Sequence, residues 1–429
     1  MKSKLLIFPK LNFNHIYFFL FFLISFIKIV IRKWIDNNNK DLAQRLFNIY
    51  TYTISDLISV IPLVINKCIS GKSKPKNKAK RTASLESNIT FIFRDHWAEK
   101  HKSLLLKTLI VAIADLLAQL ITFIFYMIKG ENEREVEEYN LNTILIVRIV
   151  SVYLLSLIIL KTYFYKHHYF SFIINIICLL FLSILDILSI NKKRTKEALM
   201  IIIYIFVKIF STLFYSLENV YGKKALMKEF LSPYSILMYI GIYEFIFLII
   251  LSIPLIFIET KDATDNYKKS IIFKRFDKFI DYTYIIKNAT LMITNFFYNL
   301  TIWTIIDKYS PNHIAMANIF ESFGASLYLV IFERNKVDRW TIYVTFIIYI
   351  FLIFGAFIHN EFIVINACGL NENTTLFLDY RAEMDLLQAK TKDNNEQDYS
   401  LSEELSSHEF GNNNNEKNGQ LFEMKNDIK

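Results

Sequence analysis

The chain has 429 residues, 53% of them hydrophobic, with a formal net charge of +9 and a mean hydropathy of +0.30. The basic residues mostly flank apolar blocks, where they anchor helices to anionic headgroups, so the positive charge does not indicate a nucleic-acid partner. The three cysteines, Cys68, Cys178 and Cys368, lie far apart in the sequence and indicate neither a disulfide framework nor a zinc site.

The apolar residues gather in blocks of about 18–25 residues, each long enough to cross a hydrocarbon core of about 30 Å as a helix. The first block, residues 14–31, has no small-residue cleavage site and is followed by Arg32 and Lys33, which favours a retained membrane anchor over a signal peptide. We predict an all-α membrane protein with about ten transmembrane helices, because strands with unpaired backbone groups are too costly in lipid. The later blocks are residues 49–67, 104–128, 143–160, 169–190, 199–219, 234–258, 282–306, 312–332 and 340–358.

Hydrophilic segments flank and interrupt these blocks. We predict that residues 1–13 are a cytosolic N-terminus and that residues 68–103 form a basic loop. Residues 359–429 form a polar C-terminal tail, which we expect to be disordered from about residue 386 because it cannot bury a core. The Lys and Arg residues of alternate loops are equally numerous on the two sides, which leaves the orientation open, although the basic loop favours a cytosolic N-terminus.

Ten helices divide into two halves of five, residues 14–190 and 199–358. Transporters often contain two such repeats in inverted orientation, with the substrate site between them. The helix pairs at residues 143–190 and 312–358 look alike, because each contains an apolar run, a charged turn and an aromatic residue that opens the next run. The pattern is consistent with an internal repeat, although any two helical hairpins share this outline.

Three longer stretches carry a more specific pattern. RIVSVYLLSLIILKTYFYKHHYFSFIINIICLLF reads as two helices, and ALMITNFFYNLTIWTIIDKYSPNHIAMANIFESFGASLYLVIF reads as a later pair. Between them, KIFSTLFYSLENVYGKKALMKEFLSPYSILMYIGIYEFI holds Glu218 before a basic loop, a Ser232-Pro233 step and then Gly241. In this order the stretches resemble helices four to nine of the drug/metabolite transporter superfamily, in its nucleotide-sugar-transporter-like branch (solute carrier family 35).

The resemblance implies ten transmembrane helices in two inverted five-helix repeats and the transport of a metabolite such as a nucleotide sugar. The closing EFIVINACGLNENT resembles a tail that follows helix ten in protist and fungal members. The same superfamily also includes vacuolar exporters of drugs, amino acids or peptides. The sequence departs from the family in its scarcity of helical glycine, with only Gly241, Gly324 and Gly355 inside the predicted helices.

Charged residues inside the apolar blocks are candidates for a solute site, because a charge at bilayer depth is costly unless it faces a cavity or a partner. Asp115 and Gln119 are four residues apart and share one helix face. Arg148 and Lys208, with Tyr215 on the same general face as Lys208, could bind an anionic solute. Each also has a structural interpretation, as an internal hydrogen bond or a side chain that snorkels to the interface.

The later helices offer further candidates. Asn295 and Asn299 are one turn apart and could bind a polar, sugar-like solute or join two helices. Glu321 could bind and release a proton, or pair with a basic residue such as Arg148. Glu218, with Lys223 or Lys224 as its partner, and Glu244 are interpreted as ion pairs that set a gate or the topology. Glu244 could alternatively bind and release a proton, as Glu321 could.

These observations favour an alternating-access secondary transporter of a small polar or anionic metabolite across an endomembrane. A proton gradient or exchange would drive it, because the sequence contains no ATP-binding motif. No enzymatic activity, cofactor or metal is predicted, and His167-His168 is interpreted as an interfacial basic turn. An intramembrane lipid-modifying enzyme and a non-transporting receptor or scaffold are the alternatives. The expected partners are a small-molecule solute and the bilayer; a homodimer, the organelle (Golgi, endoplasmic reticulum, vacuole or lysosome) and a plasma-membrane location are left open.

Overall fold

The computed structural model describes only part of the chain, and the helices discussed below belong to the first of its two compact units, Met1–Cys368 and Gly369–Lys429. Most of the basic loop and the tail beyond residue 386 lie outside the described residues. The described residues are 6–7, 16–36, 42–65, 100–129, 143–191, 198–229, 231–257, 259–261, 268–270, 282–332, 339–374, 377–378, 381 and 384.

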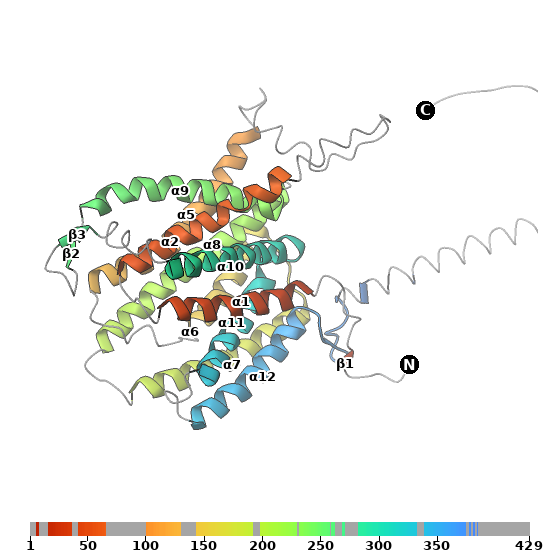
Figure 1. Cartoon of the computed structure of the whole chain (residues 1–429). Coiled ribbons are helices and arrows are strands. Elements are labelled where there is room, and N and C mark those ends of the chain that lie inside the picture. The colour runs from red at the N-terminus through yellow and green to blue at the C-terminus, as the bar shows by residue number, and fades with distance from the viewer. Residues whose placement is uncertain are drawn as a thin grey trace, which may run out of the picture. The chain divides into compact units, whose positions relative to one another are not determined.

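Helices account for almost all of the described residues (Figure 1). They are α1 (Ile16–Asp36), α2 (Leu42–Leu57), α5 (Lys100–Lys129), α6 (Thr143–Leu155), α7 (Lys166–Asn191), α8 (Ala198–Glu229), α9 (Pro233–Ile256), α10 (Tyr282–Lys308), α11 (Pro311–Phe332) and α12 (Arg339–His359). A π-helical turn, η4 (Ser156–Leu160), extends α6. Two short antiparallel pairs complete the fold, β1 (Leu6–Ile7) with β4 (Val364–Ile365) and β2 (Glu259–Lys261) with β3 (Lys268–Ser270).

Eight helical segments in the described part of the chain are long and apolar enough to cross a bilayer, which makes the chain a multi-pass, all-α integral membrane protein. They are Gln44–Ile65, Leu104–Phe125, Lys166–Leu185, Ile203–Glu229, Pro233–Ile256, Tyr282–Lys308, Pro311–Phe332 and Ile342–His359. The other two predicted blocks also form helices. The segment Ile144–Leu160 is shorter, and α1 carries Lys28, Arg32 and Lys33 in its second half.

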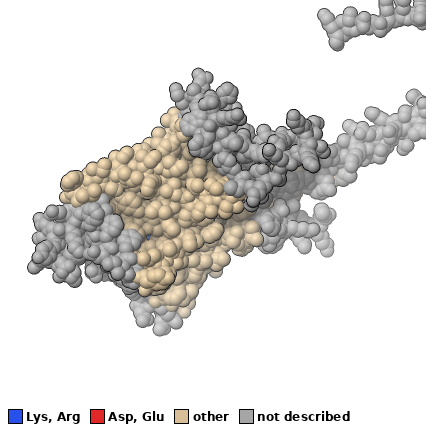
Figure 2. Space-filling view, turned by 45° about the horizontal axis from the view of Figure 1, so that its top comes forward, with Lys and Arg blue, Asp and Glu red and all other residues tan. Residues whose placement is uncertain are grey.

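The outer surface of the helices is apolar. Large hydrophobic side chains are exposed on many of them, including Phe19, Ile158, Phe181, Phe206, Ile250 and Ile350. On the face shown in Figure 2, the described surface carries almost no Lys, Arg, Asp or Glu side chains. A soluble protein rarely exposes so extensive an apolar surface, whereas a lipid-facing surface requires one.

The helices pack in a small number of extensive pairs. The closest associations join α5 with α8, α7 with α12, α1 with α10 and α6 with α8. Next come α2 with α9, α1 with α11, α5 with α9 and α10 with α2. Consequently α2 and α9 contact each other, and both of them contact α5 and α10.

Two glycines let α8 and α12 pack closely against neighbouring helices. A Cβ atom at Gly222 of α8 would overlap the ring of Trp303, which is 2% exposed on α10. A Cβ atom at Gly355 of α12 would overlap the side-chain amide of Asn175 on α7. The backbone of each glycine therefore forms part of the surface against which a large or polar side chain packs.

The beginning of α9 follows the expected local rules. The Ser232 hydroxyl caps the helix by accepting a hydrogen bond from the backbone N–H of Ser235, at 3.2 Å. Pro233 occupies the first helical position, where its missing N–H costs nothing. The predicted Ser-Pro step at the start of this helix is therefore confirmed.

The helical segment that begins with α2 is interrupted directly after Leu57, beside a glycine of α9. The α-helix ends at Leu57, and a turn at residues 58–59 connects it to a further helical segment that reaches residue 65. The backbone N–H of Ser59 donates to the carbonyl of Asp56 at 3.1 Å. A Cβ atom at Gly241 would lie 2.9 Å from the Leu57 nitrogen and 3.2 Å from the Asp56 Cβ. The close approach of α9 to the interrupted part of α2 therefore depends on glycine.

Replacing Gly241 by alanine should destabilise the protein by about 1–3 kcal/mol, because the added methyl group would press against the α2 backbone, which cannot rotate away. The matched control is Gly324→Ala, whose Cβ would meet ordinary van der Waals neighbours at 3.6–3.8 Å. Thermal unfolding of the two variants in detergent checks the difference. Equal melting temperatures for both variants would contradict the close contact of α9 with α2.

Candidate functional site

Three buried carboxylates meet at the centre of the bundle. They are Asp56 on α2, Asp115 on α5 and Glu244 on α9, and one oxygen atom of each lies within 4.8 Å of the others. Their exposed fractions are 2%, 8% and 0%. Each residue also lies close to the midpoint of its apolar segment, Gln44–Ile65, Leu104–Phe125 or Pro233–Ile256. The cluster thus occupies the depth at which charge is most costly in a bilayer.

Polar side chains on the surrounding helices hold the carboxylates in place. The Asn299 amide on α10 donates to Asp56 Oδ1 at 2.8 Å, and the Thr53 hydroxyl on α2 donates to Glu244 Oε2 at 3.1 Å. On α5, Gln119 Nε2 donates to Asp115 Oδ1 at 3.1 Å.

A second amide on α10 contributes a supporting bond. One turn before Asn299, Asn295 Nδ2 donates to the hydroxyl of Ser55 at 2.7 Å. Two successive turns of α10 are thereby attached to α2 at Ser55 and Asp56. Together with the bonds of Thr53 and Gln119, these contacts orient the cluster with donors from three helices, α2, α5 and α10.

The electrostatics of the cluster require a bound positive charge. Three carboxylates at this separation repel one another strongly where the local dielectric is low. Asp115 and Glu244 are neighbours in the cluster, and two carboxyl groups can form a hydrogen bond with each other only if one of them holds a proton. Oε1 of Glu244 meets no protein hydrogen-bond donor in the described part of the chain. The cluster is therefore suited to bind a proton or a small cation.

A lysine of α1 connects this cluster to Glu321. Lys28 interacts electrostatically with Glu321, Asp56 and Asp115, and its Nζ lies 3.6 Å from the centre of the Tyr298 ring. The Tyr298 hydroxyl in turn donates to Glu321 Oε2 at 2.9 Å. Lys28 thus lies within electrostatic range of both Glu321 and the carboxylate cluster.

A second group of predicted residues lies along α6 and α8. Tyr215 interacts electrostatically with Asp115, Glu218 and Arg148. Glu218 interacts electrostatically with Asp115, Arg148 and Asp56. Arg148, Tyr215 and Glu218 therefore lie within the electrostatic field of the central carboxylates. The predicted partners of Glu218 are engaged elsewhere, since Lys223 donates to the carbonyl of Asp307 at 2.7 Å and Lys224 lies over the Tyr221 ring.

Lys208 and Glu244 have surroundings that differ from the expectation. The Lys208 ammonium lies 5.5 Å from the centre of the Tyr204 ring. Glu244 was interpreted from the sequence as a gate or topology ion pair. In the structure it is a member of the carboxylate cluster and accepts a hydrogen bond from Thr53.

Sequence reasoning overlooked Asp56, Lys28 and Tyr298. The signal for the first two was present, because each is a charge inside a predicted apolar block, the same criterion that selected Asp115. Asp56 was overlooked because its block contains several polar residues. Tyr298 carries no comparable signal in a sequence as rich in tyrosine as this one, which has 25.

Comparison with known proteins does not assign this chain to a family. No protein-family model matches the sequence, and curated proteins give no significant match. The function must therefore be inferred from the site itself.

A hydrophobic carbodiimide, which modifies protonated carboxyl groups in apolar surroundings, should label the cluster. Labelling should increase as the pH falls, because more of the shared carboxyl groups are then protonated, and decrease as the pH rises. Mass spectrometry of the peptides that contain Asp115 and Glu244 measures the modification. Glu244→Gln should reduce the total amount of carbodiimide labelling. Glu229→Gln should leave it unchanged, because Glu229 pairs with Lys107 outside the cluster. Labelling that is independent of pH and of Glu244 would contradict a protonated cluster.

Proposed function

We propose that the protein is a secondary transporter that moves a small polar solute by alternating access, with the carboxylate cluster binding and releasing a proton or a cationic solute. The observation that carries this proposal is the meeting of Asp56, Asp115 and Glu244 at the midpoints of three apolar segments. Buried intramembrane carboxylates that share a site commonly mark proton or ion pathways.

The packing of the helices supports a two-repeat organisation. If α1, α2, α5, α6 and α7 are exchanged one by one with α8, α9, α10, α11 and α12, the most extensive packing pairs are exchanged as well. The pair α5–α8 becomes α10–α1, and α6–α8 becomes α11–α1. The pair α5–α9 becomes α10–α2, while α2–α9 and α7–α12 map onto themselves. This correspondence is expected of two five-helix repeats, and it supports counting α1 and α6 among ten transmembrane helices.

The location of the cluster also fits such an organisation. In this scheme α2 and α5 belong to the first repeat and α9 and α10 to the second, so both halves contribute to the site. Secondary transporters bind their substrates at this interface, often beside an interrupted helix such as α2. A change in the relative position of the halves would alter the separation of the carboxylates.

The charge of the cluster bears on the solute. An anion such as a nucleotide sugar would meet three carboxylates at the centre, whereas a proton, an amine or a basic amino acid would neutralise them. Among the solutes expected from the sequence, the geometry therefore favours those of vacuolar drug or amino-acid exporters over anionic metabolites. The basic side chains Lys28 and Arg148 interact electrostatically with Glu321 and Glu218 respectively.

Transport by purified protein in liposomes tests the proposal. Radiolabelled amines, amino acids, peptides, nucleosides and nucleotide sugars are offered with and without a pH gradient, and a pH-sensitive dye records proton movement. We expect gradient-dependent uptake of a cationic or neutral polar solute. Asp115→Asn and Glu244→Gln should each reduce uptake by at least ~10-fold, because losing a charged hydrogen-bond partner costs about 1.5–3 kcal/mol.

The matched control is Glu229→Gln, which makes the same chemical change outside the cluster and should transport normally. Folded wild-type protein that moves none of these solutes would contradict the transport proposal. Transport that is unaffected by Asp115→Asn and Glu244→Gln would contradict the role of the cluster, as would uptake of a nucleotide sugar without any dependence on pH.

A further inference from the structure

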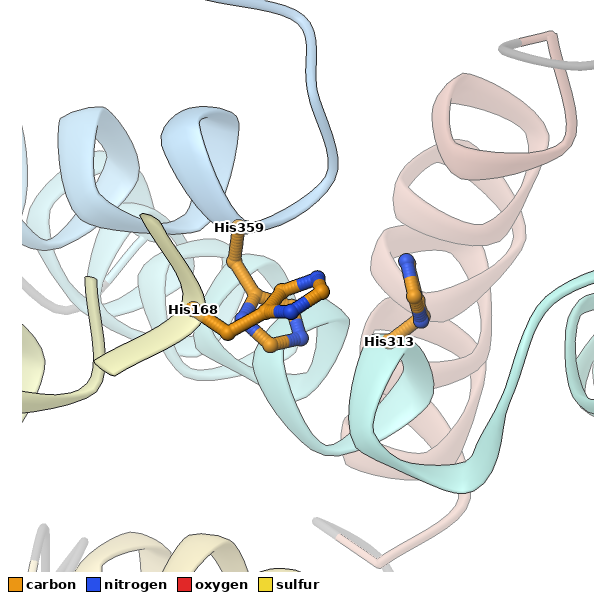
Figure 3. A group of neighbouring side chains, drawn as sticks. All are labelled: His168, His313 and His359. Carbon is orange, nitrogen blue, oxygen red and sulfur yellow. The ribbon is translucent and has the colours of Figure 1, made fainter. Parts of the chain in front are cut away.

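Three histidines from distant parts of the sequence meet at one end of the bundle. His168 lies in the first turn of α7, His313 in the first turn of α11, and His359 is the last residue of α12. One ring nitrogen of each lies within 4.8 Å of the others. The ring centres of His168 and His313 are 4.7 Å and 5.1 Å from that of His359, and 6.1 Å from each other. Figure 3 shows the rings of His168 and His359 overlapping in the view, with His313 beside them on the first turn of α11.

Two of the imidazoles are oriented by hydrogen bonds at Nδ1. The hydroxyl of Tyr153 lies 3.0 Å from His359 Nδ1, and that of Ser310 lies 2.7 Å from His313 Nδ1. Ligating histidines are commonly fixed in this way, through the ring nitrogen that does not bind the metal. His168 differs, because its Nδ1 accepts a long hydrogen bond of 3.3 Å from the backbone N–H of Tyr165. Coordination by His168 would replace or rearrange that bond.

The remaining nitrogen of His359 is the clearest indication of a missing ligand. His359 is 0% exposed, and its Nε2 has no hydrogen-bond partner in the described part of the chain. A buried polar atom without a partner costs about 1–3 kcal/mol, so such atoms usually have an occupant. A metal ion between the three rings would satisfy this nitrogen.

Both an acidic and a basic side chain lie close to the three histidines. Glu361 lies near the cluster, with Oε1 3.4 Å from Nε2 of His167, and it interacts electrostatically with His313. The ring of His167 is also 4.0 Å from that of His168. Lys223 contributes an opposing positive charge at His313. The site therefore has one carboxylate and a fourth imidazole close by.

We propose that His168, His313 and His359 bind one divalent transition-metal ion, for which zinc is the best match. Three neutral imidazoles with an open fourth position form a recurrent zinc site, and carboxylate-preferring ions such as Mg²⁺ and Ca²⁺ do not suit it. Tetrahedral coordination with Zn–N bonds of about 2.0–2.1 Å needs nitrogens about 3.3 Å apart, which small rotations of the rings would provide. The predicted interfacial basic turn at His167-His168 is thereby completed into a site by residues of α11 and α12.

Metal binding by the full-length chain in detergent tests this inference without any transport assay. After treatment with a chelator and readdition of Zn²⁺, we expect about one zinc per chain by mass spectrometry and a higher melting temperature with Zn²⁺. Co²⁺ in place of zinc should give the visible absorption of a tetrahedral site. His359→Ala and His313→Gln should each weaken zinc binding at least ~10-fold, because even outer-shell changes cost about 10–100-fold.

Two further variants separate coordination from folding. Tyr153→Phe keeps the ring but removes the hydroxyl at His359 Nδ1, and it should weaken zinc binding by about tenfold. His101→Gln removes a histidine from α5, a helix that packs on α8 and α9, and it should leave zinc binding unchanged. Zinc that binds equally to wild type and to folded His359→Ala would overturn the site. An absence of any zinc-dependent change in melting temperature would do the same.

Discussion

The burial of three carboxyl groups in a low-dielectric interior is the constraint on which the rest of the structure depends. Asp56, Asp115 and Glu244 are stable there only with shared protons or cations and with a full set of hydrogen-bond donors. Thr53, Gln119 and Asn299 meet much of this requirement. The helices that carry these donors must therefore lie within a narrow range of positions, and they gather around the carboxylates.

Much of the helical architecture follows from the sequence, because an apolar block in lipid has few alternatives to a helix. The ends of the helices are predicted less accurately than their presence. The block predicted to end at residue 219 continues to Glu229, because Asn219 and Gly222 are buried against other helices and not exposed in a loop. Hydropathy alone cannot distinguish a polar residue that faces a partner helix from one that faces water.

The candidate site was partly predictable for the same reason. Asp115, Asn295 and Asn299 were selected because polar groups at bilayer depth need a partner, and the structure brings them to one place or next to it. The packing of α2 against α9 determines which carboxylates these residues meet. This contact joins distant parts of the chain, so no local sequence pattern predicts it. The histidine cluster was even harder to predict from the sequence, because its three members are separated by more than a hundred residues or by entire helices. Its convergence is a property of the fold.

The contact of Gly222 with Trp303 has a consequence for how the molecule can move. The indole fills the space left by the missing side chain, so α8 and α10 cannot slide past each other without opening a void or creating a clash. These two helices must travel as one piece. In the proposed transporter, any rocking of one half against the other would therefore carry α8 and α10 together. Such a movement would change the distances between the central carboxylates, so their affinity for a proton would differ between the two states of the protein.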